Sequence, residues 1–189
     1  LVSSSAASDV YKRQEKYQLT RSDTDNFGLQ SQMRAKAAIE NGHFDSQIIP
    51  VEAPEMDDNF ERTDTILRVT TDEVPRETSL DALAGLKSVA REDGVHTAGT
   101  SSQIADGAAA VLMMSASKAA ELGLSPIAVI RASALVGCDP VMMLEGPIPA
   151  TEKMLKQTGL NIADIDVFEV NEAFASVVLA WAKTVGADM

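Results

Sequence analysis

A short polar loop is the first place in this sequence where the residue types could serve chemistry. It runs from His96 to Gly107 (HTAGTSSQIADG) and places three hydroxyl residues in a row beside glycines. Small residues let a ligand approach the backbone closely, and serine hydroxyls can hydrogen-bond the amides of a ligand. The same composition also fits an ordinary polar turn, so the loop alone leaves both interpretations open.

A second candidate lies in Asp164 to Ala175 (DIDVFEVNEAFA), where a predicted buried strand gives way to a helix. In α/β proteins, ligands collect at the carboxyl ends of strands and at the first turns of helices. An asparagine at this point, such as Asn171, can orient a water or donate to a developing oxyanion. The alternative is structural, with Asn171 capping the helix and Glu172 in its first turn.

Other kinds of site find little support. The sequence has no P-loop, no HExxH motif, no paired cysteines and only two histidines, so we expect no metal site. The net charge of −12 argues against nucleic-acid and anionic-membrane partners, but it leaves room for a small phosphate-bearing ligand. No apolar run approaches the roughly 20 residues of a membrane span. Because Cys138 is the single cysteine, no internal disulfide can form, and we expect a cytoplasmic protein.

Helices and strands that alternate along the second half of the chain must position these candidates. A helical pattern covers Glu15–Asn41, where Thr20 to Ser22 offer caps and acidic residues follow in the first turn. Periodicity and capping residues predict further helices from the N-cap Ser79 through Leu86, and over Ser115–Leu122, Ala150–Gln157 and Asn171–Ala182. Strands are predicted over His43–Val51, Thr65–Val69, Gly107–Met114, Ile127–Leu135 and Ile165–Val170. This order indicates an α/β protein in which helices cover a mostly buried sheet.

Four stretches of the chain, taken together, resemble thiolases. They are FGLQSQMRAKAAIENGHFDSQIIPV, TAGTSSQIADGAAAVLMMS, GPIPATEKMLKQTGL and DIDVFEVNEAFA, in the order and spacing of that family. The resemblance covers nearly everything from Glu15 to Ala182. It implies the layered αβαβα fold of thiolases, present here only in part, and acyl transfer between coenzyme A (CoA) thioesters. A related ketosynthase fits less well, because NEAFA is not the signature of that branch.

The resemblance also implies which parts of the acyl-transfer chemistry this chain carries. In thiolases a cysteine thiolate accepts the acyl group, a second cysteine moves protons, and two oxyanion holes stabilise the intermediates. Asn171 matches the asparagine that holds the water of one oxyanion hole. Glu172 is expected to support the site through hydrogen bonds.

Further matches are to residues that hold the substrate. Ser102 corresponds to a serine that contacts the pantetheine arm of CoA, and Ala98 and Gly99 give that arm access to the backbone. Phe174, with its neighbour Ala173, is expected to line the acyl pocket, and Arg76 matches an arginine near the nucleotide end of CoA. CoA is then a substrate, and the resemblance implies no covalently bound cofactor.

Some of the family's parts are not found in these 189 residues. The nucleophilic cysteine is expected upstream of Glu15, and the GHP histidine and CxGxG cysteine downstream of Met189. We therefore predict no acyltransferase turnover by this chain alone, and we expect Cys138 to be a buried structural thiol.

Two departures from the family pattern affect the functional interpretation. Thr100 and Gln103 replace an asparagine and a glycine in the CoA loop, which keeps open the alternative of a non-catalytic acyl-CoA- or lipid-binding protein. The segment MMLEGPIPATEK resembles the degradative branch of the family, which acts on fatty acids or steroids.

The expected organisation follows from these matches. Residues 1–14 share nothing with the rest and are predicted to be a non-native leader outside the fold. Residues 15–103 form a loop domain that contributes to CoA binding, residues 104–124 end the N-terminal half of a thiolase, and residues 125–189 begin a truncated C-terminal half. The full-length protein is expected to be a homodimer or homotetramer.

Overall fold

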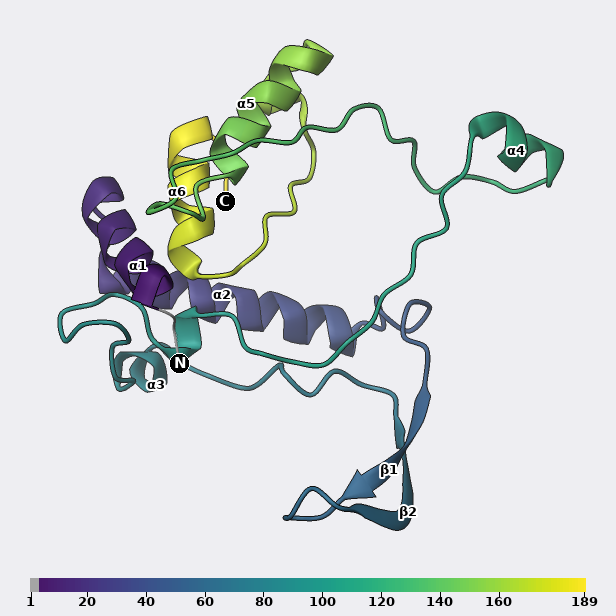
Figure 1. The fold of residues 1–189 in the computed structure, drawn as a ribbon, viewed down its shortest axis with the longest axis horizontal. Coiled ribbons are helices and arrows are strands. Elements are labelled where there is room, and N and C mark those ends of the chain that lie inside the picture. Colours follow the sequence, from purple (N-terminus) through teal and green to yellow (C-terminus); the bar gives the residue numbers. More distant parts are fainter. Residues whose placement is uncertain (1–3) are drawn as a thin grey trace.

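The computed structural model describes residues 4–189 and begins with two helices, α1 (Ser4–Tyr17) and α2 (Arg21–Glu40) (Figure 1). The sequence predicts a helical pattern over Glu15–Asn41 with caps offered from Thr20 to Ser22, and α2 does begin at the N-cap Thr20, separate from α1. The reason is a capping box, in which the Thr20 N–H donates to the Asp23 carboxylate at 2.7 Å and the Asp23 N–H donates to the Thr20 hydroxyl at 3.2 Å. This pairing satisfies backbone donors at the start of a new helix.

A two-stranded antiparallel hairpin follows α2 and stands away from the helices (Figure 1). It consists of β1 (Val51–Met56) and β2 (Arg62–Val69), with Val51 opposite Val69. The strand predicted at Thr65–Val69 is confirmed. The one predicted at His43–Val51 is wrong, because the chain turns over residues 41–47 and the ladder begins only at Val51.

The remaining helices are α3 (Leu80–Ala84), the 3₁₀ turn η1 (Ala98–Thr100), α4 (Ala116–Glu121), α5 (Pro147–Thr158), the 3₁₀ turn η2 (Ile162–Asp164) and α6 (Ala175–Val185). The predicted helices are confirmed, although α6 begins four residues later than expected. Ser79 caps α3 as predicted, since its hydroxyl accepts from the Ala82 N–H at 3.2 Å. Gly159 ends α5 with a φ of 72°, a conformation that favours glycine.

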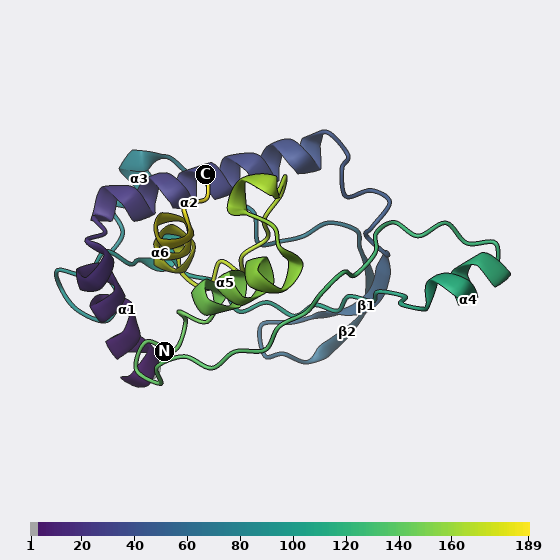
Figure 2. The same cartoon turned by 90° about the horizontal axis from the view of Figure 1, so that it is seen from above.

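The core is built around α6, which contacts α1, α2 and α5 (Figures 1 and 2). Seven of its residues are buried, from Ala175 to Ala182 with one interruption. The Trp181 indole N–H donates to the Thr151 hydroxyl of α5 at 2.8 Å, and its ring meets Phe168 edge-on with the centroids 5.0 Å apart. Because α6 is apolar and packs against three other helices, it fixes the position of residues 171–174, which lead directly into it.

Three segments predicted as buried strands form no strand. They are residues 107–114, 127–135 and 165–170. The first runs as extended chain away from the helical core, whereas the second returns to α5, where the Leu135 carbonyl accepts from Lys153 Nζ at 2.9 Å (Figure 1). Their apolar side chains are exposed, as in Val111 at 80% and Leu135 at 93%. A strand needs a hydrogen-bonded neighbour, and within residues 4–189 none lies beside them. The predicted burial of these segments is therefore wrong for the described residues, which supply no strand or helix face that covers them.

The predicted leader is part of the fold where the structure describes it. Residues 4–14 form most of α1, Val10 is 1% exposed, and α1 contacts α6. The expectation that this segment lies outside the fold is therefore wrong for residues 4–14, while residues 1–3 lie outside the described residues. Its non-native origin stays a prediction, since helix formation does not test it.

Candidate functional site

The two segments singled out in the sequence meet in the structure. Ser101 forms an antiparallel β-bridge with Phe174, and the Ser102 N–H donates to the Ala173 carbonyl at 3.0 Å. The polar loop after His96 and the segment before α6 are therefore joined by backbone hydrogen bonding. This contact brings the predicted pantetheine-binding residue beside the segment that carries the predicted oxyanion-hole residue.

Some hydroxyl groups of the polar loop hydrogen-bond within the loop, and another is exposed to solvent. Thr100 is buried and its hydroxyl accepts from the Thr97 N–H at 2.9 Å, while the Ser101 hydroxyl donates to the Thr97 carbonyl at 2.7 Å. These bonds close the short turn η1, which carries Ala98 and Gly99. Ser102 follows the turn with an exposed side chain. The structure thus leaves the hydroxyl of Ser102 accessible to a ligand.

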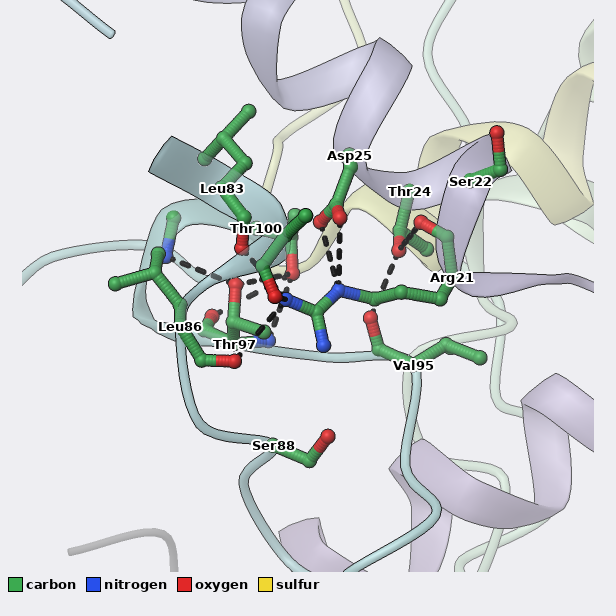
Figure 3. Close-up of polar contacts among 12 residues, drawn as sticks. Arg21, Ser22, Thr24, Asp25, Leu83, Leu86, Ser88, Val95, Thr97 and Thr100 are labelled. Atoms are coloured by element: carbon green, nitrogen blue, oxygen red, sulfur yellow. Dashed lines mark hydrogen bonds and ion pairs between the residues drawn. The ribbon is translucent and has the colours of Figure 1, made fainter. Parts of the chain in front are cut away.

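Helix α2 holds the stretch of chain that leads into the polar loop (Figure 3). The Arg21 guanidinium pairs with Asp25 at 2.8 Å and donates to the carbonyl oxygens of Leu83 at 2.6 Å and Leu86 at 3.1 Å. The Thr24 hydroxyl donates to the Val95 carbonyl at 2.8 Å. All three acceptors outside α2 are backbone carbonyl oxygens, so these contacts constrain the path of the chain up to the residue before the loop.

A close approach between α2 and the loop depends on a glycine. A Cβ atom added at Gly28 would lie 2.8 Å from the Gly99 carbonyl oxygen, which is closer than real Cβ contacts allow. Gly28 is buried in this contact. The missing side chain lets the middle of α2 press directly against the backbone that is predicted to receive the pantetheine arm.

Asn171 and Glu172 differ in how they are held. The Glu172 carboxylate accepts a hydrogen bond from the Ser31 hydroxyl of α2 at 2.8 Å. Asn171 is exposed, and its side chain makes no hydrogen bond within residues 4–189. The amide of Asn171 is therefore free to bind a ligand or water, which its prediction as a site residue requires. Sequence reasoning missed Ser31, because nothing local marks a helix serine as the partner of a residue so distant in sequence.

Arg76 is tied to both α2 and the polar loop. Its backbone N–H donates to the Gln32 side-chain oxygen at 3.0 Å, and its guanidinium donates to the Gln103 side-chain oxygen at 2.7 Å. Arg76 also lines an open groove of about 370 Å³ beside the second half of α2, with Lys36 and Thr78. Gln103, one of the departures from the family pattern, thus supplies a contact to the arginine that we predict near the nucleotide.

A larger groove lies elsewhere. It has a volume of about 750 Å³, lies along α2 and is lined mainly by apolar residues that include Phe27, Met33, Leu179 and Met189. None of the predicted site residues lines it, so it does not define the candidate site.

Cys138 corrects one expectation. It is exposed, not buried, and its Sγ donates to the Met143 carbonyl at 3.2 Å. The neighbouring segment 127–135 runs extended without a strand partner in the described part of the chain, so no sheet covers the thiol.

His96, the first residue of the polar loop, is buried against Phe174. Its side chain is fully buried, and its ring meets that of Phe174 edge-on with centroids 5.4 Å apart. Neither ring nitrogen has a hydrogen-bond partner among residues 4–189. Burial, together with the positive charge of Arg13, lowers the pKa of His96 to about 4. His96 is therefore a neutral packing residue near neutral pH, which agrees with its not matching the catalytic histidine of thiolases.

Acid should destabilise the chain through His96. The unfolded histidine binds a proton near pH 6.5 and the folded one only near pH 4, so stability falls as the pH drops between these values. When the pH falls from 7 to 5, the contribution of His96 should lower the free energy of unfolding by roughly 2 kcal/mol. Urea titrations at both pH values should show a smaller loss for His96→Gln. His43→Gln, at an exposed position, is the control, and equal losses in both variants would contradict the prediction.

The described residues hold neither a metal site nor a membrane span. No group of three or more histidine, cysteine, aspartate or glutamate side chains converges within residues 4–189. Over the same residues, no helix combines the length and the apolar character needed to cross a bilayer.

Comparison with known proteins agrees with this geometry. The family model for the thiolase N-terminal domain matches residues 5–117, and the one for the C-terminal domain matches residues 124–189. A 3-ketoacyl-CoA thiolase of a Marinomonas species is 47% identical over 170 residues, which are 89% of this chain and 42% of that protein. A steroid 3-ketoacyl-CoA thiolase of Mycobacterium tuberculosis is 47% identical over 174 residues, 92% of this chain and 40% of that protein.

A solved structure supports the same relationship. The crystal structure of the Bacillus anthracis acetyl-CoA acetyltransferase superimposes with a TM-score of 0.90 at 38% identity and covers 96% of this chain and 45% of that one. This confirms the predicted fold class, an incomplete thiolase-like α/β fold. The chain spans less than half the length of these relatives. Because the models for the N-terminal and C-terminal thiolase domains match it in order, the chain belongs to the thiolase family.

Proposed function

We propose that the intact protein transfers acyl groups between CoA thioesters, by thiolytic cleavage of a 3-ketoacyl-CoA or the reverse Claisen condensation. In the cleavage, the bond between C2 and C3 breaks and C2 takes up a proton to leave as acetyl-CoA. The remaining acyl group ends on the sulfur of a second CoA. The observation that carries the proposal is the backbone contact of Ser101 and Ser102 with Ala173 and Phe174, which joins the two family motifs.

The contacts in this chain support a division of roles along the CoA molecule. We assign the pantetheine arm to the exposed hydroxyl of Ser102 and to the backbone of Ala98 and Gly99, which η1 presents as a closed turn. Arg76, beside Lys36 in an open groove, is assigned to the nucleotide end, where the phosphates need positive charge. CoA enters as a substrate and not as a bound cofactor.

At the reacting end, Asn171 is the candidate catalytic residue. Its unpartnered side-chain amide suits a group that holds a water against a thioester oxygen, where negative charge develops. Glu172 supports it from the neighbouring position. Phe174 presents its backbone to the CoA loop and its ring to His96, so we assign it to the wall of the acyl pocket.

We further propose a degradative role and a homodimeric or homotetrameric full-length protein. The segment MMLEGPIPATEK supports the first, together with relatives named 3-ketoacyl-CoA thiolase and steroid 3-ketoacyl-CoA thiolase. Resemblance to the family supports the second.

Thiolysis by the protein encoded by the contiguous gene tests the proposed function. We expect free CoA and a 3-ketoacyl-CoA to yield acetyl-CoA and the shortened acyl-CoA, separated by chromatography. The 189-residue chain alone should give no turnover above a blank. Binding of acyl-CoA by the intact protein without any cleavage would favour the non-catalytic binding protein instead.

A further inference from the structure

One side-chain contact joins α2 to the segment that carries the candidate catalytic residue. The Ser31 hydroxyl, half-buried on α2, donates to one oxygen of the Glu172 carboxylate at 2.8 Å. Ser31 and Glu172 are 141 positions apart in the chain. Neither the family resemblance nor the local sequence assigns a role to Ser31.

The same short segment is held from a second side. The Ser102 N–H and the bridge at Ser101 fix the backbone of Ala173 and Phe174, and the Phe174 ring lies against His96. These contacts all act after residue 172. Before it, the segment from residue 165 forms no ladder, so among the bonds of the described residues the Ser31 bond is, along the sequence, the one nearest to Asn171.

The helix that carries Ser31 is itself fixed to the CoA loop. Thr24 bonds the backbone of Val95, and Gly28 lies against the backbone of Gly99. Because the same helix contacts both, the hydroxyl of Ser31 fixes the position of Glu172 relative to the loop. Since misplacement by about 1 Å can cost on the order of 10²-fold in rate, such a tether matters for a residue that orients a water.

We propose that Ser31 is a positioning residue, which acts through Glu172 to hold Asn171 at the right distance from the CoA loop. The inference rests on the proposed function, because it assigns Asn171 to the oxyanion hole. Ser31 also gives the Glu172 carboxylate a hydrogen-bond donor, which draws this negative charge toward α2. A free carboxylate beside Asn171 would oppose the charge that develops on the thioester oxygen.

The test uses the intact protein and separates kcat from KM. Ser31→Ala should lower kcat for thiolysis by about threefold to tenfold with KM for the acyl-CoA unchanged, since the contact acts on transition-state stabilisation and not on ground-state binding. Ser31→Thr keeps the hydroxyl and should restore most of the rate. Ser22→Ala, at an exposed position near the start of α2, should leave kcat unchanged.

A double-mutant cycle shows whether Ser31 acts through Glu172. In a Glu172→Ala background, Ser31→Ala should have no further effect on kcat, because the shared contact is already lost. Independent effects, or an unchanged kcat in Ser31→Ala, would overturn the inference while leaving the proposed function intact. A fall in kcat that Ser31→Thr does not restore would overturn it as well. An inactive wild-type protein would overturn the proposed function and the inference together.

Discussion

Replacing Asn171 with alanine in the intact protein is expected to lower kcat for thiolysis by about 10²- to 10³-fold, which corresponds to roughly 3–4 kcal/mol of lost transition-state stabilisation. The reason is the placement of this residue beside the CoA loop with a side-chain amide that is unpartnered within residues 4–189. A group that holds a water at a developing oxyanion acts mainly in the transition state. KM for the acyl-CoA should therefore change by much less than kcat.

Two further variants make this result specific. Asn171→Asp keeps the shape of the side chain but replaces the amide donor with a negative charge, so it should be at least as slow as Asn171→Ala. Asn59→Ala, in the turn of the β1–β2 hairpin away from the site, should retain wild-type kinetics (Figure 1). A value of kcat for Asn171→Ala within about threefold of the wild type would refute its assignment to the oxyanion hole.

The second large effect is expected in α1. Replacing Arg13 with alanine should lower the free energy of unfolding of the chain by about 3–5 kcal/mol, because it leaves the Asp9 carboxylate buried without its cation. Both side chains are fully buried, and they pair with each other one turn apart on the helix. Asp9 Oδ2 and Arg13 Nε and Nη1 have no hydrogen-bond partner in the described structure. Urea unfolding followed by circular dichroism measures the change.

Lys12→Ala is the matched control for Arg13→Ala. It removes the same charge from an exposed position of the same helix, and surface substitutions of this kind usually stay within about 0.5 kcal/mol. The double substitution Asp9→Leu with Arg13→Met should be neutral or stabilising, because it removes the cost of burying two charges. If Arg13→Ala and Lys12→Ala have equal effects, the buried pair does not stabilise α1.

The Arg13 variants also test the account of His96. The guanidinium charge is one of the two causes that lower the pKa of His96, and burial is the larger. Removing the charge should raise this pKa toward the unfolded value, so that the acid-induced loss of stability ends at a higher pH and becomes smaller.

Local signals were sufficient for the helices after α1 and for the family. The capping residue Ser79, the glycine at 159 and the apolar spacing of α6 lie within a few residues of the helix ends they specify, so each could be identified without knowledge of distant contacts. The motif around Asn171 and the loop after His96 were recognised for the same reason. Each is a short run that can be identified from its own residues.

Contacts between distant segments decided the rest. The predicted strands at 107–114 and 127–135 stay extended, since a ladder depends on a neighbouring strand and not on the strand's own residues. Composition could not separate the buried hydroxyl of Thr100 from the exposed one of Ser102, and folding alone placed Ser31 against Glu172. The sequence therefore specified the helices and the chemical groups, whereas folding determined which of those groups are free to meet a substrate.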